Sequence, residues 1–479
     1  MTKPWRLPPA PSADGDMVFS STLFLLAYLP AALLVYYLLP KRLQIPVMFV
    51  ANLIFYGWGE PVYVLLMLFS IFLNYGAAMF IDAYPSGKKK VLAACVAVNL
   101  LALCVFKYAG FLVGSAAAFI PALRLVAVPD IALPIGISFF TFQSMSYVID
   151  VYRGAVAVQK DAVAFGTYVS LFPQLIAGPI VRYEDVEKEL ASRHVGIADV
   201  DAGFKIFLAG LAKKLLLANP LGQMWEALSQ APADNGVAGS WIGIAAFAFQ
   251  IYFDFSGYSD MAIGIGRMMG FKFLENFDYP YTARSITDFW RRWHISLSTW
   301  FRMYVYVPLG GNRKGAVRQV VNLLVVWFLT GLWHGASWNF ALWGLYYAVL
   351  LIIEKLFLLK ALGQLPKAAR HAYMLFFTAV GWTLFYFVDF ASLGAYLSSM
   401  FAAGPAGLIS PGAARQAVAY LPTMAACALA STPLPKKLWR RFFAGRRLVL
   451  ESAFAALLLA VCVAAVVTQS FNPFIYFRF

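Results

Sequence analysis

Long apolar stretches recur along the whole chain and leave few folds open to it. Examples are Val18–Leu39, Val91–Phe106, Val320–Thr330, Ala341–Ile353 and Ser452–Thr468. Each is close to, or can be extended to, the ~20 residues that a helix needs to span a bilayer. They lack the alternation of apolar and polar residues that is typical of barrel strands. We therefore predict an all-α polytopic membrane protein with roughly ten to twelve crossings, plus re-entrant or interfacial helices.

The charged residues indicate how these helices are oriented. The chain has 38 Lys and Arg against 23 Asp and Glu. In a polytopic protein this excess marks cytoplasmic loops rather than a nucleic-acid site. The region from Arg284 to Arg318 carries seven basic residues and a single acidic one, Asp288. We expect this region to face the cytoplasm.

The N-terminal segment and the cysteines offer no candidates for catalysis or metal binding. Residues 1–16 combine several prolines with two aspartates, unlike a cleaved signal, so we predict a non-conforming N-terminal extension over 1–16. With no internal repeat, residues 17–479 are predicted to form a single transmembrane domain. The cysteines lie singly inside apolar runs, which favours small core residues over disulfides or metal ligands: Cys95, Cys104, Cys427 and Cys462. No metal site is expected.

One of the four histidines follows a long apolar run. His194 and His371 have polar, charged neighbours and are interpreted as solvated surface residues. His334 follows the apolar run Val320–Leu329 and lies between Gly331 and Gly335, which allow a backbone or an acyl chain to approach closely. An ionisable group at membrane depth is costly and tends to serve function, and imidazole accepts and returns protons near pH 7. Hydrogen bonding between two helices is the structural alternative.

The fourth histidine, His294, lies where tryptophans alternate with arginines. Trp293 precedes it, after the pair Arg291 and Arg292. Such a segment is typical of a helix that anchors the protein at the membrane interface. From the residues alone we favour this interpretation. The functional alternative is a cationic cradle for a phosphorylated donor, because guanidinium groups pair with phosphate.

A further polar group lies on an otherwise apolar helix. Gln250 and Asp254 are one turn apart, with Gly257 and Tyr258 on the same face. These groups must face the bundle interior or water. We interpret them as structural residues at the site rather than an ion path, because no symmetric partner motif supports transport.

Four segments together closely resemble one enzyme family. They are Phe253–Ala262, Phe289–Trp300, Pro308–Gly315 and Gly331–Ala336. They resemble the bacterial polysaccharide (alginate-type) O-acetyltransferase branch of the membrane-bound O-acyltransferases. Similarity continues from Met17 to the closing segment Asn472–Phe477.

The resemblance implies a site and a reaction. His334 matches the catalytic histidine and His294 the second active-site position. We also expect these residues to bind substrate: Arg291, Arg292, Arg302, Trp293, Trp333, Asn339, Asp254 and Tyr258. The expected reaction passes acetyl from cytosolic acetyl-CoA, with no bound cofactor, across the inner (cytoplasmic) membrane. A periplasmic transferase then O-acetylates an exported polysaccharide of the alginate, cellulose or peptidoglycan type. D-alanyl transfer to teichoic acid is the alternative.

The chain departs from the family pattern at two positions. Met303 stands where relatives commonly have aspartate, and the segment around Tyr386 lacks a common arginine. The lost carboxylate and guanidinium could alter contacts with the donor or partner, or compensate each other.

Transfer from a thioester to a hydroxyl needs a base, a stabilised oxyanion and exclusion of water. We hypothesise that His334 is the base, while His294 and Arg292 position donor and oxyanion. A transporter or flippase with intramembrane aspartates, or a scaffold without chemistry, are the rival interpretations.

Access to His334 follows from its depth. It lies 16 residues after Arg318, ~24 Å along a straight helix, and so well inside the membrane. We predict a narrow basic cytosolic tunnel near Arg291, Arg292 and Arg302, and a wider periplasmic opening, which meet at His334.

Overall fold

The computed structural model describes residues 17–126, 131–176, 178–402, 404, 406–442, 447–469, 471 and 475. Within these residues it consists of helices and their connections, with no β-strand. The prediction of an all-α protein is therefore confirmed. The predicted extension over residues 1–16 and, Ile475 apart, the closing segment Asn472–Phe477 lie outside the described residues.

Contacts between residues group the chain into two compact units. Unit 1 contains residues 1–207, 259–274 and 476–478, and unit 2 contains residues 208–258, 275–475 and 479. That residues 17–479 form a single transmembrane domain stays a prediction. The helices that begin in unit 1, with π and 3-10 turns marked η, are η1 Phe24–Tyr28, α1 Leu29–Leu38, α2 Lys41–Gly59, α3 Val64–Ala83, α4 Lys88–Leu103, η2 Cys104–Tyr108, α5 Ala109–Ala116, η3 Pro121–Leu125, α6 Ile137–Arg153, α7 Ala162–Ser170, α8 Phe172–Leu175, α9 Tyr183–Ala191 and α10 Ile197–Ala212.

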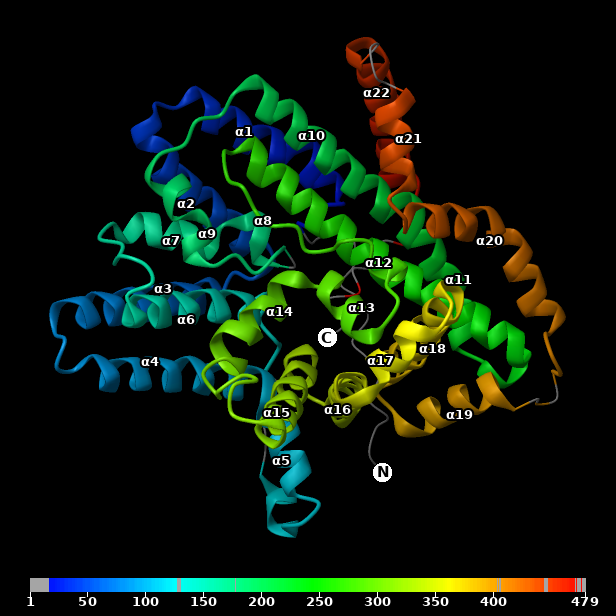
Figure 1. Cartoon of the computed structure of the whole chain (residues 1–479). Helices are drawn as coiled ribbons and strands as arrows, with labels where there is room; N and C mark the ends of the chain where they lie inside the picture. Colours follow the sequence, from blue (N-terminus) through cyan, green and yellow to red (C-terminus); the bar gives the residue numbers. More distant parts are fainter. Residues whose placement is uncertain are drawn as a thin grey trace. The chain divides into compact units, whose positions relative to one another are not determined.

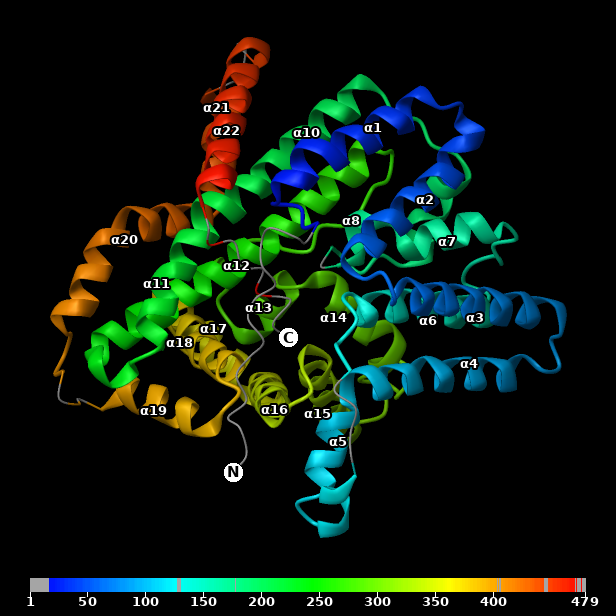
Figure 2. The ribbon, with the colours of Figure 1, turned by 180° about the vertical axis from the view of Figure 1, so that it is seen from behind.

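Helices α3, α4 and α6 of unit 1 pack against one another and lie side by side (Figures 1 and 2). Two buried asparagines join α3 to α4: Asn74 donates to Asn99 at 3.1 Å, and Asn99 donates back at 3.0 Å. Such amide pairs hold membrane helices together because lipid offers them no partner. Cys95 is buried beside this pair and is a free thiol, as the sequence predicted.

Unit 2 holds the polar segments that the sequence singled out. Its helices are η4 Lys213–Ala218, α11 Asn219–Ser229, η5 Pro232–Asp234, α12 Gly236–Met268, which continues into unit 1, η6 Pro280–Thr282, α13 Ile286–Arg292, α14 Ile295–Phe301, η7 Arg302–Tyr306, α15 Ala316–His334, α16 Trp338–Ile353, η8 Glu354–Leu358, α17 Leu359–Gln364, α18 Lys367–Tyr386, α19 Phe390–Phe401, α20 Pro411–Ala430, α21 Leu434–Phe442 and α22 Arg447–Thr468.

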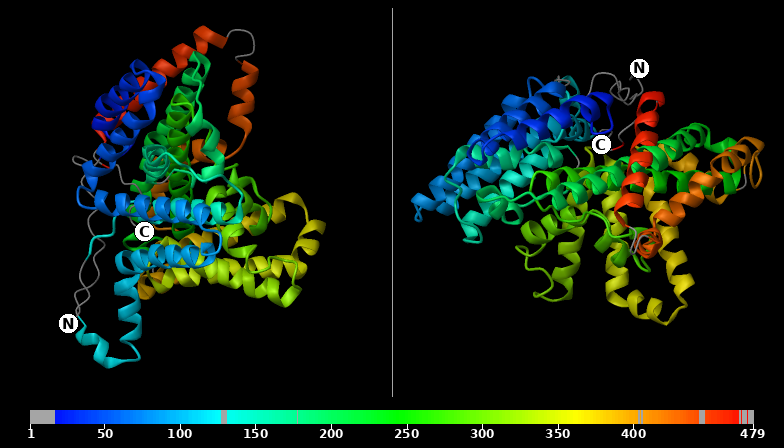
Figure 3. Two further views of the ribbon diagram at one scale, coloured as in Figure 1. Left: turned by 90° about the vertical axis from the view of Figure 1, so that its left-hand side faces the viewer. Right: turned by 90° about the horizontal axis from the view of Figure 1, so that it is seen from above.

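The centre of unit 2 is the packed pair α15 and α16, with α18 against the other side of α16. Figure 3 draws these helices in yellow-green and yellow. Glycines let α15 and α16 approach closely. A Cβ atom on Gly331 would collide with the backbone carbonyl of Phe340, and one on Gly344 with that of Trp327. Only glycine leaves room for this contact between the two backbones.

Six helices among the described residues are long and apolar enough to cross a membrane. A seventh span results if α20 and α21, which are bent by 80° at their junction, are taken together. This confirms a polytopic helical protein, whereas the number of ten to twelve crossings stays a prediction. The difference arises because some apolar stretches form shorter helices. Val18–Leu39, for example, yields a helix only over Phe24–Leu38.

Candidate active site

His334 is the last residue of α15. The helix is unbroken at Gly331, so the rise from Arg318 to His334 remains ~24 Å. The imidazole is buried and lies edge-on against two rings, with centroids 5.0 Å from Trp343 and 5.4 Å from Phe385. The two rings come from α16 and α18, so three helices fix the position of this side chain.

His294 occupies the turn between α13 and α14 in a left-handed conformation, with φ of 47°. That conformation costs a non-glycine residue roughly 1–2 kcal/mol. Asn276 holds the turn in place. Its backbone carbonyl accepts the N–H of Ile295 at 3.0 Å, and its side chain accepts the N–H of Ser296 at 3.2 Å. The strained turn is thus supported from an earlier segment of the chain.

The side chain of Asn276 also determines which nitrogen of His294 carries hydrogen. Asn276 Oδ1 also lies 2.9 Å from Ser296 Oγ and 3.2 Å from His294 Nδ1. A backbone N–H can only donate, so the amide atom that faces Ser296 must be the oxygen. His294 Nδ1 therefore donates to Asn276, and Nε2 carries the lone pair.

Burial keeps the His294 ring neutral. The residue is 1% exposed, and desolvation of the charged form lowers its pKa to about 3. A neutral ring with hydrogen on Nδ1 presents an acceptor at Nε2. It can therefore receive a hydrogen bond from a hydroxyl or amide of a substrate. Nε2 could donate a hydrogen bond to an oxyanion only if the ring were protonated.

The structure brings the two histidines together on one tryptophan, Trp333. Its ring centroid lies 5.8 Å from that of His294 and 5.0 Å from that of His334. The 40 residues that separate the histidines in sequence are thus folded back by α14, η7 and α15. Their predicted catalytic roles stay predictions.

The three predicted donor-binding arginines differ in their partners. Arg292 is paired with Asp288 at 2.9 Å and with Asp278 at 3.3 Å. Arg291 and Arg302 are exposed and have no ion-pair partner among the described residues. Those two guanidinium groups are therefore better placed than Arg292 to bind a phosphate.

Three further predicted site residues are buried. Trp293 packs against Trp382 with ring centroids 4.8 Å apart. Asn339, near the start of α16, donates to the backbone carbonyls of Leu384 and Phe385 at 3.4 Å. Asn339 thus joins the start of α16 to the part of α18 whose Phe385 packs on His334. Trp333 forms the wall shared by both histidines.

Asp254 on α12 is part of a buried ion pair. Its Oδ1 lies 2.7 Å from Lys214 Nζ, and both side chains are 3% exposed. Its Oδ2 accepts the backbone N–H of Ile475 at 2.8 Å. These contacts give Asp254 a structural role within unit 2. Tyr258 is buried one turn further along α12.

Sequence reasoning missed two residues that position His294. One is Asn276, which no local pattern distinguishes. The other is Glu354, a fully buried carboxylate whose two oxygens accept the first backbone N–H groups of α13, from Ile286 at 2.7 Å and Thr287 at 2.8 Å. An acidic residue directly after the apolar run that ends at Ile353 was the available signal.

The two positions that depart from the family pattern, Met303 and the segment around Tyr386, differ in burial. Met303 is exposed, and Tyr386 packs edge-on against Trp225 and Phe247, with centroids 4.7 and 5.0 Å away. Tyr386 is thus part of an aromatic cluster.

Comparison with known proteins shows the family of this chain. The family model for MBOAT, the membrane-bound O-acyltransferase family, matches residues 136–388, which contain both histidines, Asn276 and Glu354. The chain is 40% identical to the protein named probable alginate O-acetylase AlgI of Azotobacter vinelandii, over 77% of this chain and 75% of that one. It is 36% identical to the AlgI protein of Pseudomonas putida, over 97% of this chain and 100% of that one. It is 32% identical to the peptidoglycan O-acetyltransferase of Helicobacter pylori, over 71% and 70%. The chain is an acyltransferase that belongs to the membrane-bound O-acyltransferase family.

Proposed function

We propose that this acyltransferase takes acetyl from cytosolic acetyl-CoA and passes it across the cytoplasmic membrane for O-acetylation of an exported polysaccharide. The observation that carries the proposal is the convergence of His294 and His334 on Trp333 in a chain whose relatives are named O-acetylases and O-acetyltransferases of polysaccharides. Two imidazoles in one buried aromatic site suit proton transfer away from water.

The proposed reaction assigns a role to each histidine. His334 removes the proton from an acceptor hydroxyl while that oxygen attacks the thioester carbonyl. The new C–O bond forms, the C–S bond breaks, and the thiolate of CoA takes up the proton. His294 accepts a hydrogen bond through Nε2 and so orients the substrate hydroxyl or amide that donates it.

The cationic surface near the site supports a phosphorylated donor. Arg291 and Arg302 are exposed and without ion-pair partners among the described residues, and guanidinium groups bind phosphate strongly. The predicted tunnels stay predictions. The large cavity of unit 2 is lined by neither histidine and by none of Arg291, Arg292 and Arg302.

The test is consumption of radiolabelled acetyl-CoA by the purified chain, with its partner transferase and polymer supplied. Wild type and His194→Gln, which changes an exposed histidine far from these contacts in sequence, are expected to release CoA at equal rates. His334→Gln is expected to lose at least a hundredfold, the usual contribution of general base catalysis. Full activity in His334→Gln would remove the base from this mechanism.

A second arm separates the donors. If the chain consumes a D-alanyl carrier-protein thioester and leaves acetyl-CoA intact, D-alanyl transfer replaces acetyl transfer as the function. If neither thioester is consumed while labelled carrier crosses vesicle membranes in a cation-dependent way, the transporter interpretation holds.

A further inference from the structure

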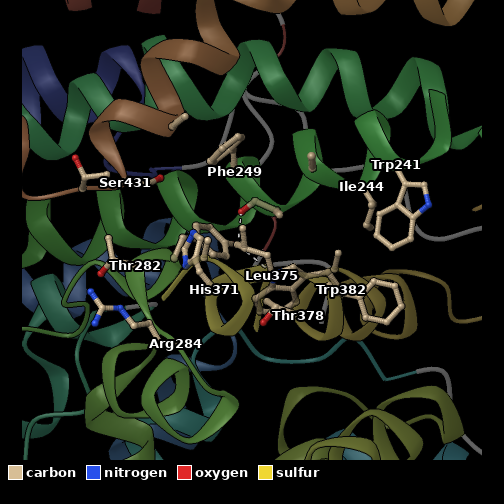
Figure 4. A pocket seen from close by; sticks show the side chains of 18 of the residues that line it. Trp241, Ile244, Phe249, Thr282, Arg284, His371, Leu375, Thr378, Trp382 and Ser431 are labelled. Carbon is tan, nitrogen blue, oxygen red and sulfur yellow. Dashed lines mark hydrogen bonds between the residues drawn. The ribbon is translucent and has the colours of Figure 1, made fainter. Parts of the chain in front are cut away.

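A large cavity in unit 2 is lined by neither His294 nor His334. Its volume is about 680 Å³, within the range of small-molecule sites. The walls come from α12, η6, α18 and the end of α20. Figure 4 shows Arg284, Thr282 and His371 on one side and Trp241 and Ile244 toward the other. We propose that this cavity binds an anionic glycerophospholipid, with the phosphate at Arg284 and Lys367 and an acyl chain along the apolar wall.

The basic residues at one end favour an anion. Arg284 and Lys367 are exposed, and neither has an ion-pair partner among the described residues. His371 lies beside them with Nδ1 3.0 Å from the carbonyl of Ala283. That carbonyl can only accept, so Nδ1 donates to it. No described residue that lines the cavity is acidic. The carboxylate of Asp288 accepts the backbone N–H of Arg284 at 3.3 Å, but its charge is paired with Arg292 at 2.9 Å.

The inner walls favour hydrocarbon because their polar groups already have partners. The hydroxyls of Thr282, Ser431 and Thr432 each donate to a backbone carbonyl of the chain. Tyr281 Oη donates to the carbonyl of Ala248 at 2.6 Å, and the indole N–H of Trp241 to that of Met400 at 2.9 Å. A ligand with amides deep in the cavity would leave them unpaired, which is costly, whereas methylene groups lose nothing.

The dimensions and location suit one leaflet of a bilayer. Along α18 the lining runs from Lys367 to Trp382, ~22 Å at the rise of an α-helix. This exceeds half of the ~30 Å hydrocarbon core, so a single acyl chain fits. The α12 residues of the wall belong to a candidate membrane span. Leu375 and Phe376, which also line the cavity, are exposed apolar side chains and suit contact with lipid.

The inner end of the cavity is closed off from the site by an aromatic wall. The indole N–H of Trp382 donates to Tyr281 Oη at 3.0 Å. On its other side Trp382 contacts Trp293 and Phe385, with centroids 4.8 and 5.7 Å away. A bound acyl chain would therefore pack behind the residues that surround the two histidines, and this proposal does not depend on the identity of the acyl donor.

The test measures lipid retention by the full-length chain, purified in mild detergent from mixed vesicles of phosphatidylglycerol and phosphatidylcholine. Native mass spectrometry is expected to show one retained phosphatidylglycerol in wild type. Arg284→Gln with Lys367→Gln should reduce its retention at least tenfold, since both charge-assisted contacts are lost. The charge-matched control, Lys436→Gln with Arg440→Gln on α21, should retain lipid as wild type does.

A second variant probes the tail and leaves the cations in place. Ala379→Phe fills the apolar wall and is also expected to reduce retention at least tenfold. Equal retention of both lipids by wild type, or unchanged retention in the Arg284 and Lys367 double variant, would overturn the proposal. Displacement of the lipid by acetyl-CoA alone would assign the cavity to the acyl donor instead. If Ala379→Phe does not fold, the double variant decides, because its two side chains are exposed.

Discussion

Asn276 is the residue whose removal tests the site most directly. Asn276→Leu keeps the approximate size of the side chain but deletes the oxygen that accepts from Ser296 N, Ser296 Oγ and His294 Nδ1. The hydroxyl can turn to another acceptor and the imidazole can shift its hydrogen to Nε2, whereas the backbone N–H of Ser296 keeps its hydrogen and loses its acceptor. Leaving this one buried donor unsatisfied costs about 1–3 kcal/mol, so we expect a loss of about 1–3 kcal/mol in folding free energy.

Asn276→Asp is the matched control, because a carboxylate accepts from the same three donors. It should fold, keep hydrogen on His294 Nδ1 and retain activity within about tenfold of wild type. A negative charge beside the ring also raises the pKa of His294, so the acid limb of its pH–rate profile should move to higher pH.

The assays are thermal unfolding in detergent and acetyl-CoA consumption across pH. Asn276→Leu should lose both stability and at least tenfold in rate at temperatures where it remains folded. Wild-type stability and rate in Asn276→Leu would refute the reasoning, as would an unmoved acid limb in Asn276→Asp.

Three more predictions concern buried charge. Glu354→Gln replaces one acceptor oxygen of the α13 cap with an N–H₂ group and should cost about 1–3 kcal/mol in thermal unfolding; an unchanged unfolding temperature would show that the cap is dispensable. Asp254→Asn alone should destabilise the protein by about 3–5 kcal/mol, because Lys214 is left buried without its partner, and adding Lys214→Met should recover part of the loss. Recovery of none would indicate that the ion pair is not the reason. Because the folded-state pKa of His294 lies below its unfolded value of about 6.5, its contribution to stability is complete above that pH and is lost as pH falls. Wild type should therefore lose up to about 1.4 kcal/mol per pH unit more than His294→Gln between pH 6 and 4, and equal slopes would contradict the burial argument.

Several features of the site could be predicted from local sequence because they follow from local chemistry. An imidazole after a long apolar run is costly unless it is used, and this pointed to His334 before any fold was known. The glycine at 331 predicted close approach, and the structure places the backbone of α16 there. The resemblance of four segments to one family then made His294 a candidate active-site residue, although its tryptophan and arginine neighbours alone favoured a membrane anchor.

Other features required the tertiary structure because they join residues that are distant in sequence. His371 was predicted to be a solvated surface residue and Arg284 to belong to a cytoplasmic region, yet α18 and the segment before α13 bring them to one cavity. Arg292 looked like a donor ligand, yet Asp278 and Asp288 are its partners. Asn276 carried no signal, since an asparagine between ordinary neighbours predicts only a turn.

The sequence by itself thus determined that this is a membrane protein built of helices, and it singled out His334 as a candidate base, which stays a prediction. These follow from the length of apolar runs, since a backbone in lipid must satisfy its own hydrogen bonds, and from the cost of an ionisable group there. The fold alone decided which atom of His294 is the acceptor and which aromatic rings enclose both histidines. Those properties depend on directional contacts between residues that are 18 to 51 positions apart, from Asn276 to His294 and from His334 to Phe385, and local patterns do not encode them.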